Sequence, residues 1–307
     1  MRAFAWFLAL LAAALGAVAV LTYPAWLLLH RHFDFPFHRI GERVGMLALA
    51  AGFLALARRL QLADRASLGY GLARPLFVRE LLLGLALGAV TMLVIVVVMG
   101  ALGLLGWSQA AGLGAGALAR LLLASLASGL AVAFIEETFL RGAMYTAIQR
   151  ESGARSAVLL TSLLYAATHF FGKVRIAPAD VTPWSGVALL GQSLQAFAHF
   201  AGIVDAFLAL TAVGVVLALV RQATGNIAAC LGLHAGWVWV MLVAHELSAP
   251  RRDAPLGFLL SRFDGFVGWL VLVWTLLLAV PLWRFYAARA AKIAPVDAAG
   301  KKSVRQP

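Results

Sequence analysis

The chain has 307 residues, of which 63% are hydrophobic and only 12% are charged, and its formal net charge is +12. Soluble domains carry about 25% charged residues, so this composition excludes an ordinary soluble protein. The basic residues lie between long apolar runs, which argues against a nucleic-acid-binding surface and favours a membrane topology signal. We therefore expect an integral membrane protein in contact with a lipid bilayer, with no nucleic-acid partner.

Apolar runs of about 20 residues, the length that crosses a bilayer, recur along the chain. They predict an all-α, polytopic bundle of about eight transmembrane helices, at residues 4–29, 42–57, 80–105, 117–149, 155–171, 203–220, 226–246 and 265–283. The first run has the position of a signal peptide, but its apolar stretch is too long for one, so an uncleaved span is expected. Gly84 and Gly88 in the third run predict close contact with another helix.

The chain divides into N-terminal transmembrane helices at 1–110, a core at 111–246, a last transmembrane helix at 247–285 and a basic, disordered tail at 286–307. With the N-terminus inside, most of the 25 Lys and Arg residues fall in cytoplasmic segments, as the positive-inside rule requires. We expect both termini in the cytoplasm, and the membrane to be a bacterial inner (plasma) membrane. The single cysteine, Cys230, excludes a disulfide framework.

Five ionisable residues fall inside the predicted spans: Glu136, Glu137 and Arg141 on one helix, His169 on the next and His234 on a third. Placing a charge in the bilayer costs at least ~2.5 kcal/mol, so such residues need a functional or structural reason. At 1.5 Å per residue, Glu136, His169 and His234 each lie about 20 Å from the cytoplasmic end of their helix. We therefore expect these three side chains to line one cavity.

Local spacing suggests different roles for the two glutamates. Glu137 and Arg141 are spaced i, i+4 and are expected to form an ion pair, while Glu136 points about 100° away and is left for other work. A carboxylate facing two imidazoles supplies a general base and transition-state stabilisers. The same Glu136, His169 and His234 would also suit zinc, with a fourth position for water. The spacing leaves both alternatives open.

Three motifs in this region resemble those of one family. The stretch Phe134–Gly142 (FIEETFLRG) resembles an EExxxR motif, and Tyr165–His169 (YAATH) is similar to an FxxxH motif with Tyr in place of Phe. His234–Val238 (HAGWV) resembles an HxxxN motif, with Val where Asn or Asp is usual. Together and in this order they resemble the CPBP family of intramembrane proteases, which includes CAAX proteases and bacteriocin-processing, Abi-like peptidases.

The resemblance implies a membrane-embedded peptidase acting on a membrane-associated or lipidated protein or peptide. It implies that Glu136 activates water, that His169 orients the water or relays a proton, and that His234 faces the oxyanion. Glu137 joins these three as a candidate catalytic residue, and Arg141 is its charge partner. Family members are often called metalloproteases, although the mechanism can be written without metal, so a divalent cation such as zinc and a metal-independent glutamate mechanism are both open.

Val238 departs from the family pattern and removes an amide donor at the oxyanion. One such donor is worth ~10²–10³ in rate, so either another group replaces it or the protein is slow or inactive. A catalytically inactive membrane scaffold or immunity protein is therefore one alternative. A transporter or proton relay is another, because buried Glu, His and Arg also mark ion pathways. The lack of a visible inverted repeat argues against a transporter.

Overall fold

The computed structural model describes residues 1–30, 32–33, 35–107, 112–171 and 175–293. It confirms the predicted all-α membrane bundle, and the strands in this part of the chain have only two residues each. In chain order the elements are α1 (Arg2–Leu29), α2 (Phe37–Arg59), α3 (Arg74–Ala101), β1 (Leu105–Gly106), α4 (Ala115–Glu137), the π-helix η1 (Thr138–Met144), α5 (Tyr145–Thr168), the 3₁₀ turn η2 (Pro178–Asp180), α6 (Ser185–Ser193), α7 (Gln195–Ala198), the 3₁₀ turn η3 (Phe200–Gly202), α8 (Val204–Thr224), α9 (Ala228–Leu247), β2 (Ala249–Pro250), the 3₁₀ turn η4 (Gly257–Leu259) and α10 (Trp269–Ile293).

Seven helices in the described part of the chain are long and apolar enough to cross a membrane. One of them, Ala115–Thr168, has 54 residues and would be about 80 Å long if it were straight, far more than a hydrocarbon core of ~30 Å. It is divided at Gly153, whose φ of 81° and ψ of 167° are not helical. The two parts correspond to the predicted helices 117–149 and 155–171, so these helices account for every predicted span.

Most helix ends differ from the predicted boundaries by a few residues, and two differ more. Helix α3 begins at Arg74, and its first turn contains Pro75, a position where proline is well tolerated. Helix α10 continues to Ile293, beyond the expected end of the last span at residue 283 and into the expected tail. Its last turns are anchored by Arg289, whose Nε donates to both carboxylate oxygens of Glu80 on α3 at 2.8 Å. The rest of the expected tail, residues 294–307, lies outside the described residues.

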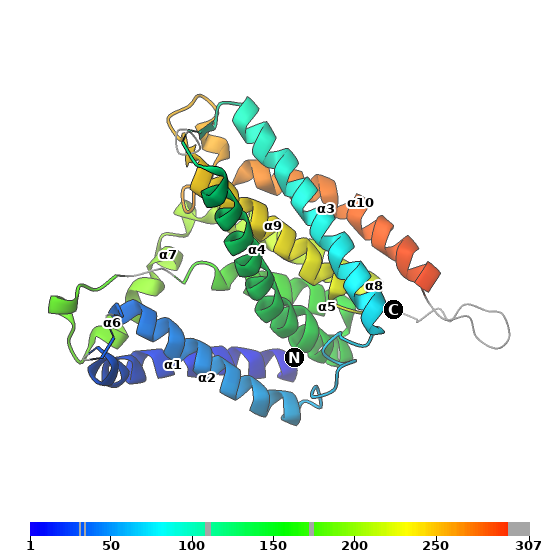
Figure 1. The fold of residues 1–307 in the computed structure, drawn as a ribbon. Helices are drawn as coiled ribbons and strands as arrows, with labels where there is room; N and C mark the ends of the chain where they lie inside the picture. Colours follow the sequence, from blue (N-terminus) through cyan, green and yellow to red (C-terminus); the bar gives the residue numbers. More distant parts are fainter. Residues whose placement is uncertain (31, 34, 108–111, 172–174, 294–307) are drawn as a thin grey trace.

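The helices form a main bundle and a lateral pair. Helix α9 packs against both α3 and α4, α8 packs against α5 and α10, and α1 packs against α2 and α6. Figure 1 shows α1 and α2 as a layer beside the bundle of α3, α4, α9 and α10. The glutamate-bearing helix α4 and the histidine-bearing helix α9 are therefore direct neighbours.

Glycines bring α9 and α3 into backbone contact. A Cβ atom at Gly84 would lie 2.7 Å from the carbonyl oxygen of Ala229, and one at Gly88 would collide with the backbone of α9. Conversely, Cβ atoms at Gly232 and Gly236 would collide with the backbone of α3. This confirms the close contact predicted for the glycines of the third run. Small residues allow this approach in membranes, where it replaces the hydrophobic effect as the source of helix association.

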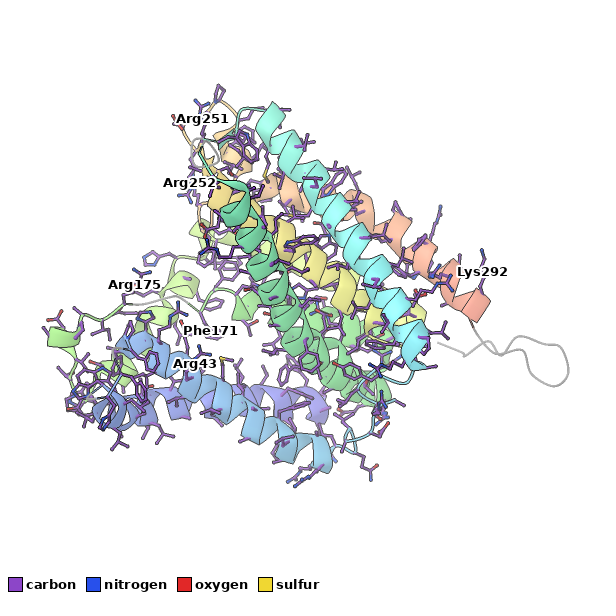
Figure 2. The ribbon with its side chains drawn as sticks, in the orientation of Figure 1. Arg43, Phe171, Arg175, Arg251, Arg252 and Lys292 are labelled. Carbon is purple, nitrogen blue, oxygen red and sulfur yellow. The ribbon has the colours of Figure 1, made fainter. Side chains whose placement is uncertain are left out.

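The two ends of the bundle have different character. At one end, β1 pairs with β2 in antiparallel fashion; we call this the β-strand end. The opposite, Gly153 end has the turn at Gly153, the loop 60–73 and the turn between α8 and α9. A hollow of about 700 Å³ opens there, lined by Asp64, Ala66, Ser67, Thr146, Gln149, Arg150, Arg221, Gln222, Ala223, Gly225, Trp283 and Ala287. Figure 2 shows Arg251 and Arg252 far from Lys292, on the opposite side of the molecule.

A carboxylate from the Gly153 end caps the first helix. Oε1 of Glu151 accepts a hydrogen bond from the backbone N–H of Arg2 at 2.6 Å, and Oε2 accepts one from Ala3 at 2.7 Å. The first N–H groups of a helix have no partner within it. Here that partner comes from the segment that follows the fourth span.

Candidate active site

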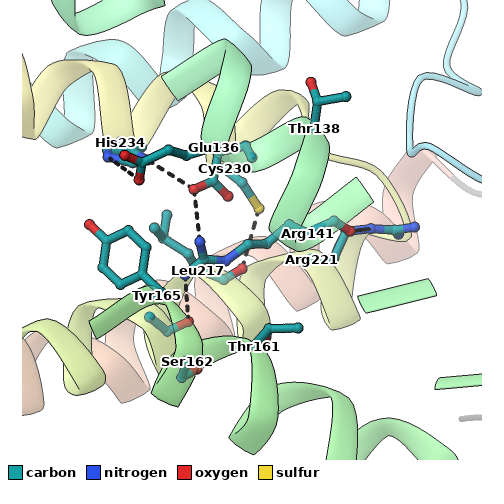
Figure 3. A network of polar contacts seen from close by, with 12 residues as sticks. Glu136, Thr138, Arg141, Thr161, Ser162, Tyr165, Leu217, Arg221, Cys230 and His234 are labelled. Atoms are coloured by element: carbon teal, nitrogen blue, oxygen red, sulfur yellow. Dashed lines mark hydrogen bonds and ion pairs between the residues drawn. The ribbon is translucent and has the colours of Figure 1, made fainter. Parts of the chain in front are cut away.

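A buried carboxylate, Glu137, is the centre of a polar network inside the bundle, and Figure 3 labels its partners Arg141 and His234. Its Oε1 lies 3.1 Å from Nη1 of Arg141 and 2.8 Å from Nδ1 of His234, and the side chains of Glu137 and Arg141 are 0% exposed. Arg141 also donates from Nη2 to the carbonyl oxygen of Gly214 on α8, at 3.2 Å. The network thus joins α4, η1, α8 and α9 at one point.

An irregular helical segment positions Arg141. The π-helix η1 follows Glu137 directly and contains Arg141. Such π-helical turns are rare in proteins, and those that occur are often found at functional sites. The carbonyl oxygen of Arg141 accepts a hydrogen bond from Nε of Arg221 at 3.0 Å. At the start of η1, the hydroxyls of Tyr70 and Thr138 lie 2.6 Å apart. Thr138 also donates to the carbonyl oxygen of Phe134 at 2.6 Å, so Arg221 and Thr138 give backbone carbonyls in and just before η1 a polar partner.

Glu136 has a different environment from its neighbour. Its side chain is 31% exposed, and its Oε2 faces Nε2 of His234 at 3.9 Å. This separation is too long for a direct hydrogen bond, but one small oxygen-containing group can bond to both atoms at once. Since an ionised carboxylate only accepts hydrogen bonds, the contact with Glu137 assigns a proton to Nδ1 of His234 and leaves Nε2 directed at Glu136.

Tyr165 links the remaining histidine to this network. Its ring is edge-on to His234, with centroids 5.8 Å apart, and edge-on to His169, with centroids 4.5 Å apart. The guanidinium of Arg141 lies over the same ring, 4.7 Å from its centroid. His169 is half-buried, and its Nδ1 lies 2.8 Å from the carbonyl oxygen of Tyr165, so its Nε2 faces away from its own helix. Within the described residues, His169 has no direct hydrogen bond to Glu136 or His234.

The last motif position carries no polar group. Val238 is half-buried on α9, one turn after His234. The i, i+4 spacing on a regular helix puts the two side chains on one face. An amide at this position would lie beside the histidine, whereas valine offers only methyl groups. The donor expected from the motif is therefore missing here.

The residues considered as zinc ligands do not form a complete ligand set. No group of three or more His, Cys, Asp and Glu side chains suited to a metal ion occurs in the described part of the chain. Glu136 and His234 face each other, whereas the described contacts of His169 are with Tyr165 and not with these two side chains. A catalytic zinc site needs three protein ligands around one point, so the chemistry below is derived from the side chains alone.

Two residues of the network were not predicted from the sequence. Arg221 lies next to a turn and looks like an ordinary loop charge, but it is only 6% exposed. Tyr165 was visible only as an aromatic residue inside a histidine motif. The available signal was its departure from the Phe of that motif, since tyrosine adds a hydroxyl to an otherwise apolar position.

The described part of the chain thus combines membrane-spanning helices with a buried Glu–Arg–His network and a second, partly exposed glutamate. Residues 115–240 match the family described as Rce1-like, type II CAAX prenyl endopeptidase. This stretch is therefore an Rce1-like domain, and it confirms the resemblance carried by the three motifs. It contains α4, η1, α5 and α8 and reaches into α9, which together carry all the network residues. No curated protein and no solved structure matches the chain.

Proposed function

We propose that the protein is a glutamate-dependent intramembrane endopeptidase, with Glu136 as the general base. The observation that supports this most directly is the contrast between the glutamates. Oε1 of the fully buried Glu137 contacts both Arg141 and His234. Glu136 is 31% exposed, and its Oε2 has no partner among the described residues and faces Nε2 of His234. A general base must be able to reach the proton that it takes. Glu136 meets that condition and Glu137 does not.

The proposed reaction uses one water molecule and no external reagent. Glu136 takes a proton from water while the water oxygen attacks the scissile carbonyl carbon, and the carbonyl π electrons move to oxygen. Nε2–H of protonated His234 donates to this oxyanion, as donors in an oxyanion hole do. The intermediate then collapses, the C–N bond breaks, and Glu136 returns its proton to the leaving nitrogen. The products are a carboxylic acid and an amine.

The scheme uses both ring nitrogens of His234 as donors, Nδ1–H toward Glu137 and Nε2–H toward the oxyanion. Glu137 holds Nδ1–H of the ring at 2.8 Å, which fixes the orientation of the imidazole as in carboxylate–histidine pairs of other hydrolases. His169 is proposed to orient the attacking water through Nε2, since its Nδ1 is bonded to its own helix.

For the substrate, we propose a lipidated membrane protein cleaved near its C-terminus. The support is the match to the family described as type II CAAX prenyl endopeptidase. We place the catalytic core at residues 111–246, which encloses the matched segment, and both termini on the cytoplasmic side of a bacterial inner membrane. The support for this orientation is the excess of basic residues at the Gly153 end of the bundle.

The test is peptide hydrolysis in proteoliposomes by the wild type and by Glu136→Gln. The substrates are a farnesylated C-terminal peptide and the same peptide without its lipid. Glutamine has the shape of glutamate but cannot accept the proton, so we expect hydrolysis by Glu136→Gln to fall to background. Cleavage by the variant at the wild-type rate would refute Glu136 as the base. Equal kcat/KM for the two peptides would refute recognition of the lipid but would leave Glu136 as the proposed base.

A further inference from the structure

Tyr165 carries an unpartnered hydroxyl inside the proposed active site. The residue is only 3% exposed, and its ring contacts Arg141, His169 and His234. Figure 3 shows its hydroxyl directed toward the side of the site occupied by His234 and Glu136. Within the described residues, this hydroxyl makes no hydrogen bond to protein.

Among the described residues, the hydroxyl of Tyr145 is fully buried without a partner, whereas the hydroxyl of Tyr165 is not fully enclosed. The Tyr165 hydroxyl therefore stays open to a group that enters the site. Packing does not require the hydroxyl here: phenylalanine would keep the three ring contacts and would remove the unpaired group. The family motif has that phenylalanine. A tyrosine at this point is therefore explained best by a partner that arrives with the substrate.

The chain also lacks a hydrogen-bond donor on the neighbouring part of the site, at position 238 of α9. Val238 replaces an amide that the family motif would place beside His234, and Tyr165 adds a donor whose ring lies 5.8 Å from the His234 ring. The two departures are complementary: one removes an N–H donor from the surroundings of His234, and the other brings an O–H donor into them. Tyrosine hydroxyls are among the groups that stabilise oxyanions in enzymes.

We infer that the hydroxyl of Tyr165 donates a hydrogen bond to the oxyanion of the tetrahedral intermediate, in place of the amide missing at position 238. This inference rests on the proposed function, because it needs an acyl-transfer reaction at Glu136 and His234. Tyr165 is then a catalytic residue of this chain: its hydroxyl bonds to the reacting oxygen together with Nε2–H of His234. No proton is transferred from the hydroxyl, so the balance of the hydrolysis is unchanged.

The experiment compares wild type, Tyr165→Phe, Val238→Asn, the double variant Tyr165→Phe/Val238→Asn, and Glu136→Gln in the farnesylated-peptide assay. One oxyanion donor is worth ~10²–10³ in rate, so Tyr165→Phe should lower kcat by that factor with little change in KM. Asparagine at 238 should restore much of this loss in the double variant. In the wild-type background it should change kcat little, because the donor is already present.

Tyr145→Phe is the matched control. Tyr145 lies before the break at Gly153, is 0% exposed, and also has a hydroxyl without a partner among the described residues. Its ring lies 5.6 Å from the guanidinium of Arg221, but within the described residues it makes no hydrogen bond or ring contact with Glu136 or His234. Its replacement should leave kcat within about twofold of wild type, since no oxyanion reaches it. Thermal unfolding of each variant in detergent shows whether a loss of activity reflects loss of fold.

The possible outcomes separate the inference from the proposed function. If Tyr165→Phe keeps wild-type kcat while Glu136→Gln is inactive, the protease stands and the role of Tyr165 is wrong. If wild type is inactive and Val238→Asn is active, the tyrosine does not supply the missing donor. If Tyr165→Phe loses activity and stability together and asparagine at 238 restores neither, the tyrosine is structural. Absence of hydrolysis in every form overturns both proposals.

Discussion

Glu136 and Glu137 are adjacent in sequence and opposite in surroundings. One side chain is 31% exposed and faces the imidazole across 3.9 Å, whereas the other is 0% exposed and touches both Arg141 and His234. Successive residues on a helix point about 100° apart. The two glutamates in the last turn of α4 therefore enter different surroundings. Glu137 is fixed by its contacts with Arg141 and His234, whereas Glu136 can accept a proton during the proposed reaction.

Replacing Glu137 should therefore lower the stability of the protein, because Glu137 holds the buried network together. Glu137→Gln leaves Arg141 buried without its carboxylate, and breaking one side of a buried pair typically costs about 3–5 kcal/mol. We expect a clear fall in the melting temperature of Glu137→Gln in detergent. Glu136→Gln, at the accessible neighbour, should melt close to wild type. Similar melting temperatures for both variants would contradict this division of roles.

At the scale of single residues, the sequence was sufficient to identify the site residues that are ionisable and lie within apolar runs. An ionisable side chain in an apolar run is visible from its letter, so Glu136, Glu137, Arg141, His169 and His234 could all be named as candidates. The burial of Arg221 and the ring position of Tyr165 depend on how helices pack, which no single helix encodes. The direct contact of Glu137 with His234 likewise follows only from the crossing of α4 and α9.

Among the elements, the helix pair α3 and α9 sets the position of His234. The glycines of both helices bring the two backbones together, so His234, two residues after Gly232, is placed by backbone contact. A displacement of α9 would move the imidazole relative to both glutamates. Close helix contact is thus a condition for the geometry of the site.

Gly232→Ala tests that condition. Its Cβ would collide with the carbonyl oxygen of Leu81 on α3, and forcing extra volume into a packed core costs typically 1–3 kcal/mol. We expect lower thermal stability together with reduced kcat, measured by unfolding in detergent and by peptide hydrolysis.

Gly16→Ala on α1 is the control for this prediction, because a Cβ there meets nothing within 4 Å. Alanine also favours helix more than glycine does, so this variant should be as stable as wild type or more so. If Gly232→Ala behaves like Gly16→Ala, the backbone contact does not position His234.

The elements also show where a hydropathy pattern stops being informative. Apolar runs located the spans because length and polarity are properties of the run itself. The π-helix η1 left no such trace, since its residues TFLRGAM have no periodicity of their own and its partners come from other elements. The extension of α10 was hidden because Arg289 reads as a tail charge until Glu80 of α3 is beside it.

For the whole molecule, the two ends of the bundle differ enough to set its orientation. Arg251 and Arg252 lie near the β-strand end, whereas Lys292 lies at the far end of α10 (Figure 2). The proposed topology puts the Gly153 end in the cytoplasm. Cys230, the native cysteine, is 0% exposed, so a cysteine introduced at the surface can be labelled selectively.

Arg252→Cys and Lys292→Cys provide the measurement, since both positions are exposed. In intact spheroplasts, a membrane-impermeant maleimide should label Arg252→Cys and leave Lys292→Cys unlabelled. Permeabilised cells should label both, which controls for reactivity. The reverse pattern in intact cells would mean that the positive-inside bias was read in the wrong direction.

The cap that Glu151 places on α1 has a consequence for how the chain is made. Arg2 and Glu151 are 149 positions apart, and a ribosome adds about 5–20 residues per second. About 7–30 s therefore pass between the synthesis of Arg2 and that of the carboxylate that caps the first helix. During that interval the first N–H groups of the helix depend on water at the membrane surface. The contact between the first helix and the segment after the fourth span can form only once both have been made.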